Sequence, residues 1–222
     1  MDSILFLILA ALYLVLLGWG IILLMRDAKP GLRYLLLVVT AGLVWDNVLI
    51  GLGRWIGEGA LLEHLSLTRF WTHALFTPLL TLVAYDLIVR AGSGWARSTF
   101  ARAAAWVFTL ALVVLELLYE TIGTSLEAVY EYGALRYTAA DSSGPPIMVI
   151  LVLIPLFTAG IVLWRRRKSP WLFIGTLLML VGSAIELPIE SSAATNVFEL
   201  LLMTSLWISV HQARRWVRPL AR

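Results

Sequence analysis

Seven apolar runs, separated by short polar or Pro/Gly-containing breaks, account for most of this chain of 222 residues. The runs lie near residues 3–25, 32–52, 70–89, 99–119, 147–164, 171–188 and 196–216. Each is close to the ~20 residues that an α-helix needs to cross the hydrocarbon core of a bilayer. The pattern therefore predicts an all-α, polytopic membrane protein in which residues 1–222 form a single domain of seven transmembrane helices.

Composition limits the chemistry that such a bundle can carry. Hydrophobic residues make up 60% of the chain, charged residues make up 14%, and the mean hydropathy is +0.88, which excludes an ordinary soluble domain. Binding or catalysis is therefore expected inside the helical bundle. The chain has no Cys and three His, which excludes disulfides, Cys nucleophiles and multi-histidine zinc sites. We accordingly assign no metal and no cofactor.

Basic residues are concentrated in alternate connections between the runs. All Lys and Arg fall in the connections after the first, third and fifth runs or in the C-terminal segment, except Arg54, Arg69 and Arg136. The positive-inside rule then places the N-terminus outside and the C-terminus in the cytoplasm, as expected for a multi-pass protein of a bacterial plasma membrane. Because topology explains the basic clusters, no nucleic-acid role is expected. The acids show the opposite bias, and several fall within predicted spans, where ionisable groups usually face a cavity or a partner.

An internal duplication is indicated when the chain is compared with itself. At an offset of 140 residues, positions 18–51 fall on 158–191 without a gap. The informative matches are Arg26 with Arg166, Pro30 with Pro170, Gly42 with Gly182 and Asp46 with Glu186. They predict parallel three-span units, approximately 1–90 and 145–222, joined by a linker helix over 98–120 that inverts the chain once. In a looser register, His73 falls on Glu199.

The second run contains a buried acid in the sequence Trp45-Asp46-Asn47. Asp46 lies roughly 10 Å below the outer end of its span at 1.5 Å per residue, a depth that calls for a functional or a pairing reason. Its repeat partner Glu186 is followed four residues later by Glu190, which places both carboxylates on one helical face.

Two further spans carry titratable groups near their outer ends. The third opens with Arg69-Phe70-Trp71-Thr72-His73, and the fourth carries Glu116 and Glu120 on one face with Tyr119 between them. If these faces converge, the side chains line one cavity that opens to the outer side. We expect catalytic roles for Asp46, His73, Glu116 and Glu186, and substrate contacts from Trp45, Asn47, Arg69, Trp71, Tyr119, Glu120, Glu190 and Glu199. Structural pairing between helices is the alternative for each of them, and for Trp45 simple packing.

Other polar residues receive structural interpretations. Glu58, Glu63 and His64 are expected in a solvated loop, and Glu127 and Glu131 on an amphipathic stretch at the membrane interface. Asp86 is expected to pair with Arg90 four residues later, near the inner end of the third span.

Known mechanisms are excluded by missing residues. A retinal-binding pump needs a Lys in its last span, whereas Lys29 and Lys168 fall in cytoplasmic connections. A P-loop, a GxSxG elbow and an HExxH helix are absent. Paired acids in different environments can still donate and accept a proton without metal or nucleotide. This favours an acid-base enzyme, of a lyase or isomerase type, that acts on an isoprenoid or lipid within the bilayer.

The arrangement resembles the integral-membrane lycopene cyclases and the small fungal and bacterial meroterpenoid cyclases. The resemblance rests on the seven-span plan, the length, the acid after a Trp in the second span (Trp45-Asp46) and the acid of the second repeat, Glu186, followed by Pro188. It implies that a protonated carboxylic acid starts the cyclisation of an olefin or epoxide, with a lipid-soluble substrate as the partner.

Two other classes of function fit the same architecture. Small sugar and PQ-loop transporters share the three-plus-one-plus-three plan, and paired membrane acids can couple solute movement to protons, although no Pro-Gln pair occurs here. A receptor or assembly protein without chemistry is also compatible. The sequence indicates no oligomeric state.

Overall fold

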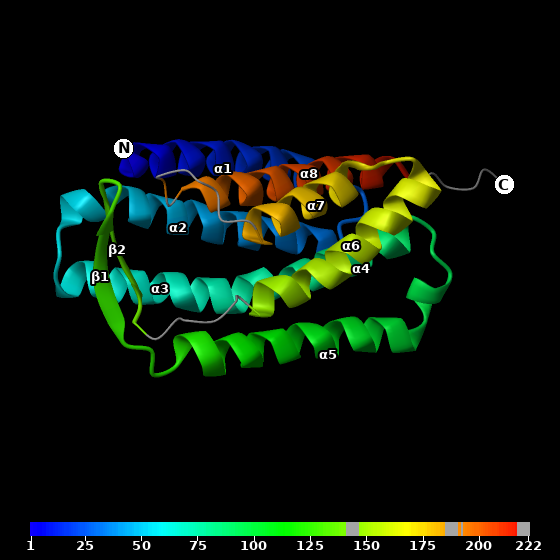
Figure 1. Cartoon of the computed structure of the whole chain (residues 1–222). Coiled ribbons are helices and arrows are strands. Elements are labelled where there is room, and N and C mark those ends of the chain that lie inside the picture. The colour runs from blue at the N-terminus through cyan, green and yellow to red at the C-terminus, as the bar shows by residue number, and fades with distance from the viewer. Residues whose placement is uncertain (141–146, 185–190, 192, 217–222) are drawn as a thin grey trace.

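The computed structural model describes residues 1–140, 147–184, 191 and 193–216, and it is a bundle of long helices capped at one end by a β-hairpin (Figure 1). The helices are α1 (Asp2–Met25), α2 (Leu36–Ile56), α3 (Ala60–Phe76), α4 (Leu80–Arg90), α5 (Thr99–Glu116), α6 (Ile147–Arg167), α7 (Trp171–Ala184) and α8 (Ala194–Trp216). Short helical turns join them at η1 (Leu32–Leu35), η2 (Thr77–Leu79), η3 (Trp95–Arg97) and η4 (Leu117–Thr121).

Five helical segments among the described residues are long and apolar enough to cross a membrane: Asp2–Met25, Leu32–Ile56, Ala60–Arg90, Thr99–Thr121 and Ile147–Arg167. They confirm the first five predicted runs, and the architecture is compatible with a multi-pass membrane protein. Helices α7 and α8 occupy the ranges of the last two runs. However, the described part of α7 has 14 residues, and polar residues make up a larger share of α8 than of any of the five segments.

The third run begins earlier than expected. Helix α3 starts at Ala60, and α3, η2 and α4 follow one another without a break over Ala60–Arg90. Glu63 and His64 therefore lie on a helix, and their assignment to a loop is wrong, whereas Glu58 lies in the turn before it. Sequence alone missed this because the first turns of α3 carry polar residues that resemble a loop.

The centre of the bundle is formed where α1, α2 and α8 meet. Trp207 of α8 is fully buried and lies against Gly20 of α1, where an added Cβ would approach the indole ring to 2.2 Å. The indole Nε1 donates a hydrogen bond to Thr40 Oγ1 of α2 at 3.1 Å. Gly20 therefore sets how closely α1 and α8 approach.

A buried ionic network holds the end of the bundle that carries the basic connections. The Arg33 side chain is fully buried and pairs with Asp27 and with Asp86, the latter at 2.9 Å. Asp86 also pairs with Arg90 at 3.2 Å, which confirms the predicted i, i+4 pair. Arg90 reaches the Lys29 carbonyl at 2.6 Å, so the connection between α1 and α2 is tied to the end of α4.

The other basic clusters gather at the same end. Arg166 and Arg167 of α6 donate to the carbonyl groups of Gly92 and Ala91, just after α4 ends. Arg214 of α8 donates to the Arg26 carbonyl. These guanidinium groups donate to carbonyl groups that have no partner within the helix at its C-terminal end. The basic residues that predict the topology therefore also link the helix ends to one another.

The opposite end carries a β-hairpin, the one departure from an all-α fold within the described residues. Strands β1 (Leu126–Glu131) and β2 (Ala134–Ala139) pair antiparallel, so Glu127 and Glu131 lie on a strand. The hairpin tip is bonded to the start of α1, where Ser3 Oγ donates to the Gly133 carbonyl at 2.9 Å. Its second strand crosses Gly53 of α2 so closely that a Cβ there would lie 1.9 Å from the Leu135 carbonyl oxygen.

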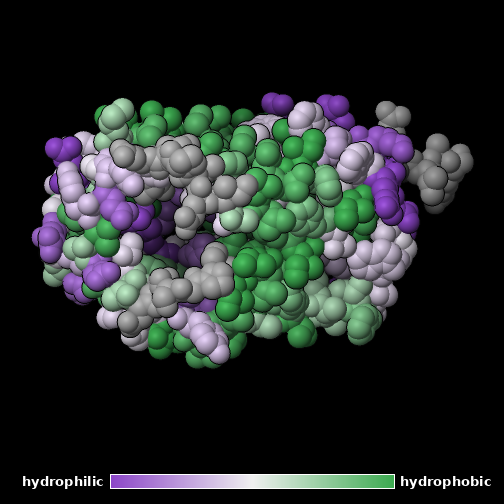
Figure 2. Space-filling model, viewed as in Figure 1, coloured by the Kyte–Doolittle hydropathy of each residue, from purple (hydrophilic) through white to green (hydrophobic). Residues whose placement is uncertain are grey.

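The bundle is apolar in its middle and polar at both ends, as Figure 2 shows. The hairpin-bearing third of the bundle contains a hollow, which the described parts of α6 and α7 line together with α2, α3, α5 and α8.

Candidate functional site

The hollow has a volume of about 990 Å³, which lies at the upper end of the range for small-molecule sites. Helices α2, α3, α5, α6, α7 and α8 all contribute to its walls, and Figure 2 shows hydrophilic side chains recessed within it. Its polar lining comprises Asp46, Arg69, Thr72, His73, Thr77, Glu116, Tyr119, Glu120, Thr124, Thr195, Asn196 and Glu199.

An ion pair joins the α2 and α3 walls. Arg69 Nε lies 2.7 Å from Asp46 Oδ1, with 14% and 26% of the two side chains exposed. The pairing explains how Asp46 is tolerated at this depth, because a buried charge requires a partner. It also distinguishes Asp46 from the other carboxyl groups of the hollow, because Asp46 is bonded directly to a guanidinium.

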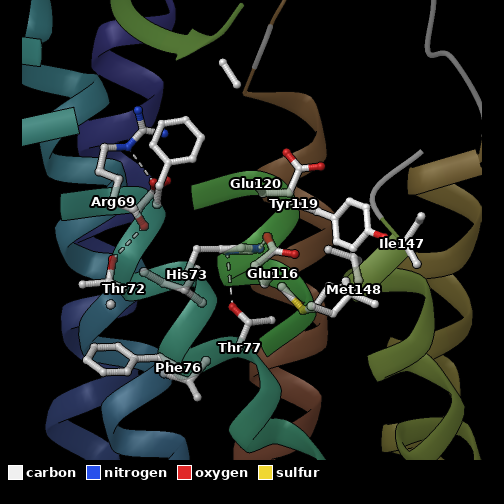
Figure 3. A pocket seen from close by; sticks show the side chains of 18 of the residues that line it. Arg69, Thr72, His73, Phe76, Thr77, Glu116, Tyr119, Glu120, Ile147 and Met148 are labelled. Atoms are coloured by element: carbon white, nitrogen blue, oxygen red, sulfur yellow. Dashed lines mark hydrogen bonds and ion pairs between the residues drawn. The ribbon is translucent and has the colours of Figure 1, made fainter. Parts of the chain in front are cut away.

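A histidine and a glutamate face each other between α3 and α5 (Figure 3). His73 Nε2 lies 3.9 Å from Glu116 Oε1, and the other ring nitrogen, Nδ1, lies 3.3 Å from Thr77 Oγ1. Thr77 thus fixes the orientation of the ring toward Glu116. Tyr119 and Glu120 follow on η4, a turn of π-helix, which is frequent at functional sites.

Glu199 enters the hollow from α8. It lies close enough to Asp46 for their charges to interact. Within the described parts of the chain, no Lys or Arg nitrogen lies within 4.0 Å of the carboxyl groups of Glu116, Glu120 or Glu199. Three carboxyl groups therefore share the hollow without a permanent cation.

The floor of the hollow is largely apolar. Val39 and Leu43 of α2, Val149 of α6 and Met179 of α7 line it, and a pit of about 40 Å³ continues below them, with His73, Thr77 and Glu199 also in its lining. The pit reaches the packed side chains of Leu80, Leu153, Leu156, Leu202 and Met203. The site is therefore amphipathic, with acids toward the hairpin and hydrocarbon toward the bundle centre.

Seven of the predicted site residues line the hollow together: Asp46, Arg69, His73, Glu116, Tyr119, Glu120 and Glu199. Glu186 and Glu190 lie outside the described residues. The structure thus assembles the predicted residues from α2, α3, α5 and α8 into one site.

Three predicted substrate contacts do not line the hollow. Asn47 is fully buried, where its side-chain nitrogen donates to the Leu43 carbonyl at 2.9 Å and its oxygen accepts from Asn196 at 3.3 Å. Trp45 donates from Nε1 to Thr68 Oγ1 at 2.8 Å and is 37% exposed, and Trp71 is 45% exposed. These three residues join helices or face outward, since neighbours of a site residue on a helix point in other directions.

Some lining residues were missed by sequence reasoning. Thr77 lies one turn after His73, a spacing that places both on one face, and this signal could have found it. Asn196 lies one turn before Glu199 in the same way. Tyr13 of α1 gave no signal because it lies in a uniformly apolar run; it is fully buried and lies close to Glu199.

The described residues contain no group of three His, Asp or Glu side chains arranged to hold a metal ion. Comparisons with protein-family models, with curated proteins and with solved structures found no match. The function is therefore argued from the geometry of the site.

Proposed function

We propose that this chain is an intramembrane acid-base enzyme that isomerises or cyclises an uncharged isoprenoid or other lipid-soluble substrate. One observation carries the proposal: carboxyl groups from α5 and α8 and the His73–Glu116 pair converge on a hollow whose floor is largely apolar. Such a site offers proton donors and acceptors to a hydrocarbon, and acid-base catalysis of this kind needs no metal, nucleotide or water.

The chemistry follows from the different partners of the acids. Glu199 has no cation partner among the described residues and serves as the acid: its proton adds to one carbon of a C=C bond, and the π electrons form the new C–H bond. The carbocation left on the other carbon accepts the π electrons of a second C=C bond, which closes a ring. Loss of a neighbouring proton to Glu116, assisted by His73, restores a C=C bond, so substrate and product are isomers.

The charge of the lining supports an uncharged substrate. The Asp46–Arg69 pair is internally neutral, which leaves Glu116, Glu120 and Glu199 to set the potential of the hollow. A phosphate or diphosphate group would lie among acids of the same sign of charge, whereas a carbocation formed during the reaction would be stabilised by them.

The proposal includes the full topology: seven spans in a bacterial plasma membrane, with the N-terminus outside. It is supported by the joining of the basic connections at one end and by the positive-inside rule. The hairpin and the hollow then lie on the outer side, where the hollow faces the outer leaflet.

The proposed duplication is supported by one packing relationship. Gly42 of α2 lies against Phe76 of the next span, and its repeat partner Gly182 of α7 lies against Phe198 of the next helix. Gly20 and Gly160, another matched pair, have unlike neighbours, Trp207 in one case and the Phe173 backbone in the other. Helix α5 is the linker between the two units in this scheme.

The test compares lipid extracts from cells that make the wild-type chain, Glu199→Gln or Glu127→Gln at matched membrane levels. Glu127 is an exposed hairpin acid and provides the control. Because isomerisation leaves mass unchanged, chromatographic retention is scored together with mass. We expect a lipid peak that requires Glu199 and tolerates Glu127→Gln. Identical extracts from all three would overturn the proposal and direct attention to proton-coupled transport.

A further inference from the structure

The hollow opens on the side of the bundle. Figure 2, which views the bundle from the side, shows hydrophilic side chains recessed in the hollow, with apolar surface beside them toward the centre of the bundle. Tyr119 of η4 and Ile147 and Met148 of α6 line the hollow on this side. A ligand leaving through the opening would move away from the bundle axis, in the plane of a surrounding bilayer.

The depth of the site places this opening beside hydrocarbon. Glu116 lies 17 residues above Thr99, the first residue of α5, which is about 25 Å at 1.5 Å per residue. His73 lies the same number of residues before Arg90, at the basic end of α4. Since the hydrocarbon core is about 30 Å thick, these groups lie at the level of the outer leaflet and below the head groups.

Between η4 and α6 the described edge of the hollow carries exposed apolar surface. Tyr119 on η4 is 78% exposed and Ile147 of α6 is 54% exposed, and both line the hollow. In Figure 3 the Tyr119 ring is directed toward Ile147 and Met148. The exposed neighbours Leu118 and Ile150 continue this apolar surface along η4 and α6. A hydrocarbon chain could pass over this edge without leaving apolar surroundings.

We propose that the site exchanges its ligand sideways with the outer leaflet, between Tyr119 and Ile147, and that the occupant is a single hydrocarbon chain. The chain end lies over the apolar pit below Val149, and the reacting or polar part lies between Glu116 and Glu199. This inference rests on the proposed function for the identity of the site, and it adds the route by which the ligand arrives.

The test uses the full chain in phosphatidylcholine vesicles that contain a long-chain alcohol with a diazirine in its chain. After irradiation, adducts are mapped by mass spectrometry over α3 and η2. Residues there that face outward serve as the reference for residues that line the hollow. Thr72, His73 and Thr77 line the hollow, whereas Trp71 and Leu75 are exposed on the outer surface. We expect adducts on both sets. Adducts confined to Trp71 and Leu75 would overturn the inference.

Matched variants test the route itself. Ile147→Trp narrows the opening and is expected to lower the ratio of hollow to surface adducts several-fold, while Ile150→Trp, which places the same ring on the outer surface, leaves the ratio unchanged. Tyr119→Ala widens the opening and raises the ratio, with Leu118→Ala as its control. Equal ratios in each variant and its control would overturn the route.

The absence of native Cys permits a complementary measurement. Thr72→Cys places a unique thiol in the hollow, and Glu127→Cys places one on the exposed hairpin. A charged, water-soluble thiol reagent should modify the hairpin thiol much faster; equal rates would show an opening to water. The two proposals can fail separately. If the lipid extracts are the same with and without Glu199→Gln but diazirine adducts form in the hollow, the enzyme proposal is overturned and the sideways opening is supported.

Discussion

The Nε2 atom of His73 lies 3.9 Å from the Oε1 atom of Glu116, and the two residues come from helices α3 and α5. This contact brings α5, which is largely exposed along its length, into the wall of the hollow. Thr77 holds the other ring nitrogen of His73 at 3.3 Å. In the proposed mechanism this pair accepts the proton, and its two members are expected to act as a unit.

A double-mutant cycle tests this coupling. His73→Gln and Glu116→Gln should each lower the rate of product formation by roughly 10²-fold, the usual contribution of a general acid or base. The double variant should be little worse than either single one, because residues that act as a unit are not additive. His64→Gln, on the exposed first turns of α3, is the control. If the rate loss in the double variant equalled the product of the two single losses, the two residues would act independently.

The Asp46–Arg69 pair is expected to support the fold as well as the site. Asp46→Asn leaves the guanidinium without its carboxylate and should lower the free energy of unfolding by about 2 kcal/mol, between the values for exposed and buried pairs. Adding Arg69→Gln should restore part of this loss. Stability is measured by denaturant titration in micelles, with the exposed Arg54→Gln on α2 as control. No recovery in the double variant would contradict a direct pairing.

Arg33 should be the most sensitive residue of the ionic network. Its fully buried side chain pairs with Asp27 and Asp86, so Arg33→Gln removes the cation that the two carboxylates share and leaves each with one weaker partner, Arg214 at 3.9 Å for Asp27 and Arg90 at 3.2 Å for Asp86. We expect a loss of about 3 kcal/mol in the free energy of unfolding, as for other broken buried pairs. Arg97→Gln, an exposed change at the same end, should have little effect. Equal stability of the two variants would contradict the structural role of the network.

The network also predicts an acid dependence. Burial disfavours the Asp27 carboxylate, but hydrogen bonds from Tyr34, Arg33 and the Lys29 backbone N–H outweigh it and lower the pKa of Asp27. Its stabilising contribution is therefore complete above the pKa of an unfolded Asp, about 3.9. It is lost as the pH falls further, through the lower pKa of the folded protein.

Thermal unfolding in micelles as a function of pH measures this contribution. Asp27→Asn should lower the melting temperature at neutral pH and flatten its decline below about pH 4, where the wild-type group titrates. Glu127→Gln, on the exposed hairpin, should leave the profile unchanged. Parallel profiles for the wild type and Asp27→Asn would show that Asp27 makes no such contribution.

Sequence patterns predicted the helices well because apolar runs of membrane length leave few alternatives. Helix α5 begins at Thr99, the predicted start of the fourth run, and Asp86 pairs with Arg90 as the spacing indicates. The hairpin was missed because its strands are short and its acids alternate with apolar residues, as on an amphipathic surface. The start of α3 was missed because its polar first turns resemble a loop.

The site was only partly predictable for a geometric reason. From depth and helical facing, the sequence predicted that Asp46, His73, Glu116 and Glu199 line one cavity, and they do. The prediction was possible because each lies near the outer end of its span. The choice of Asn47 as a substrate contact failed, since adjacent helix positions point about 100° apart at 3.6 residues per turn. The Asp46–Arg69 pair joins residues 23 positions apart on different helices, and no local pattern reveals such a partner.

The proposed mechanism depends on proton transfer from the Glu199 carboxyl group to a carbon atom of the substrate. To test this step, membranes containing the wild-type chain are supplied with the substrate identified from the lipid extracts and incubated in D₂O, where the Glu199 carboxyl exchanges its proton with solvent before it reacts. We expect a product that carries one solvent deuterium bound to carbon, formed by the wild type and by Glu127→Gln but not by Glu199→Gln. A product formed without deuterium, or formed equally by Glu199→Gln, would contradict acid catalysis at this site.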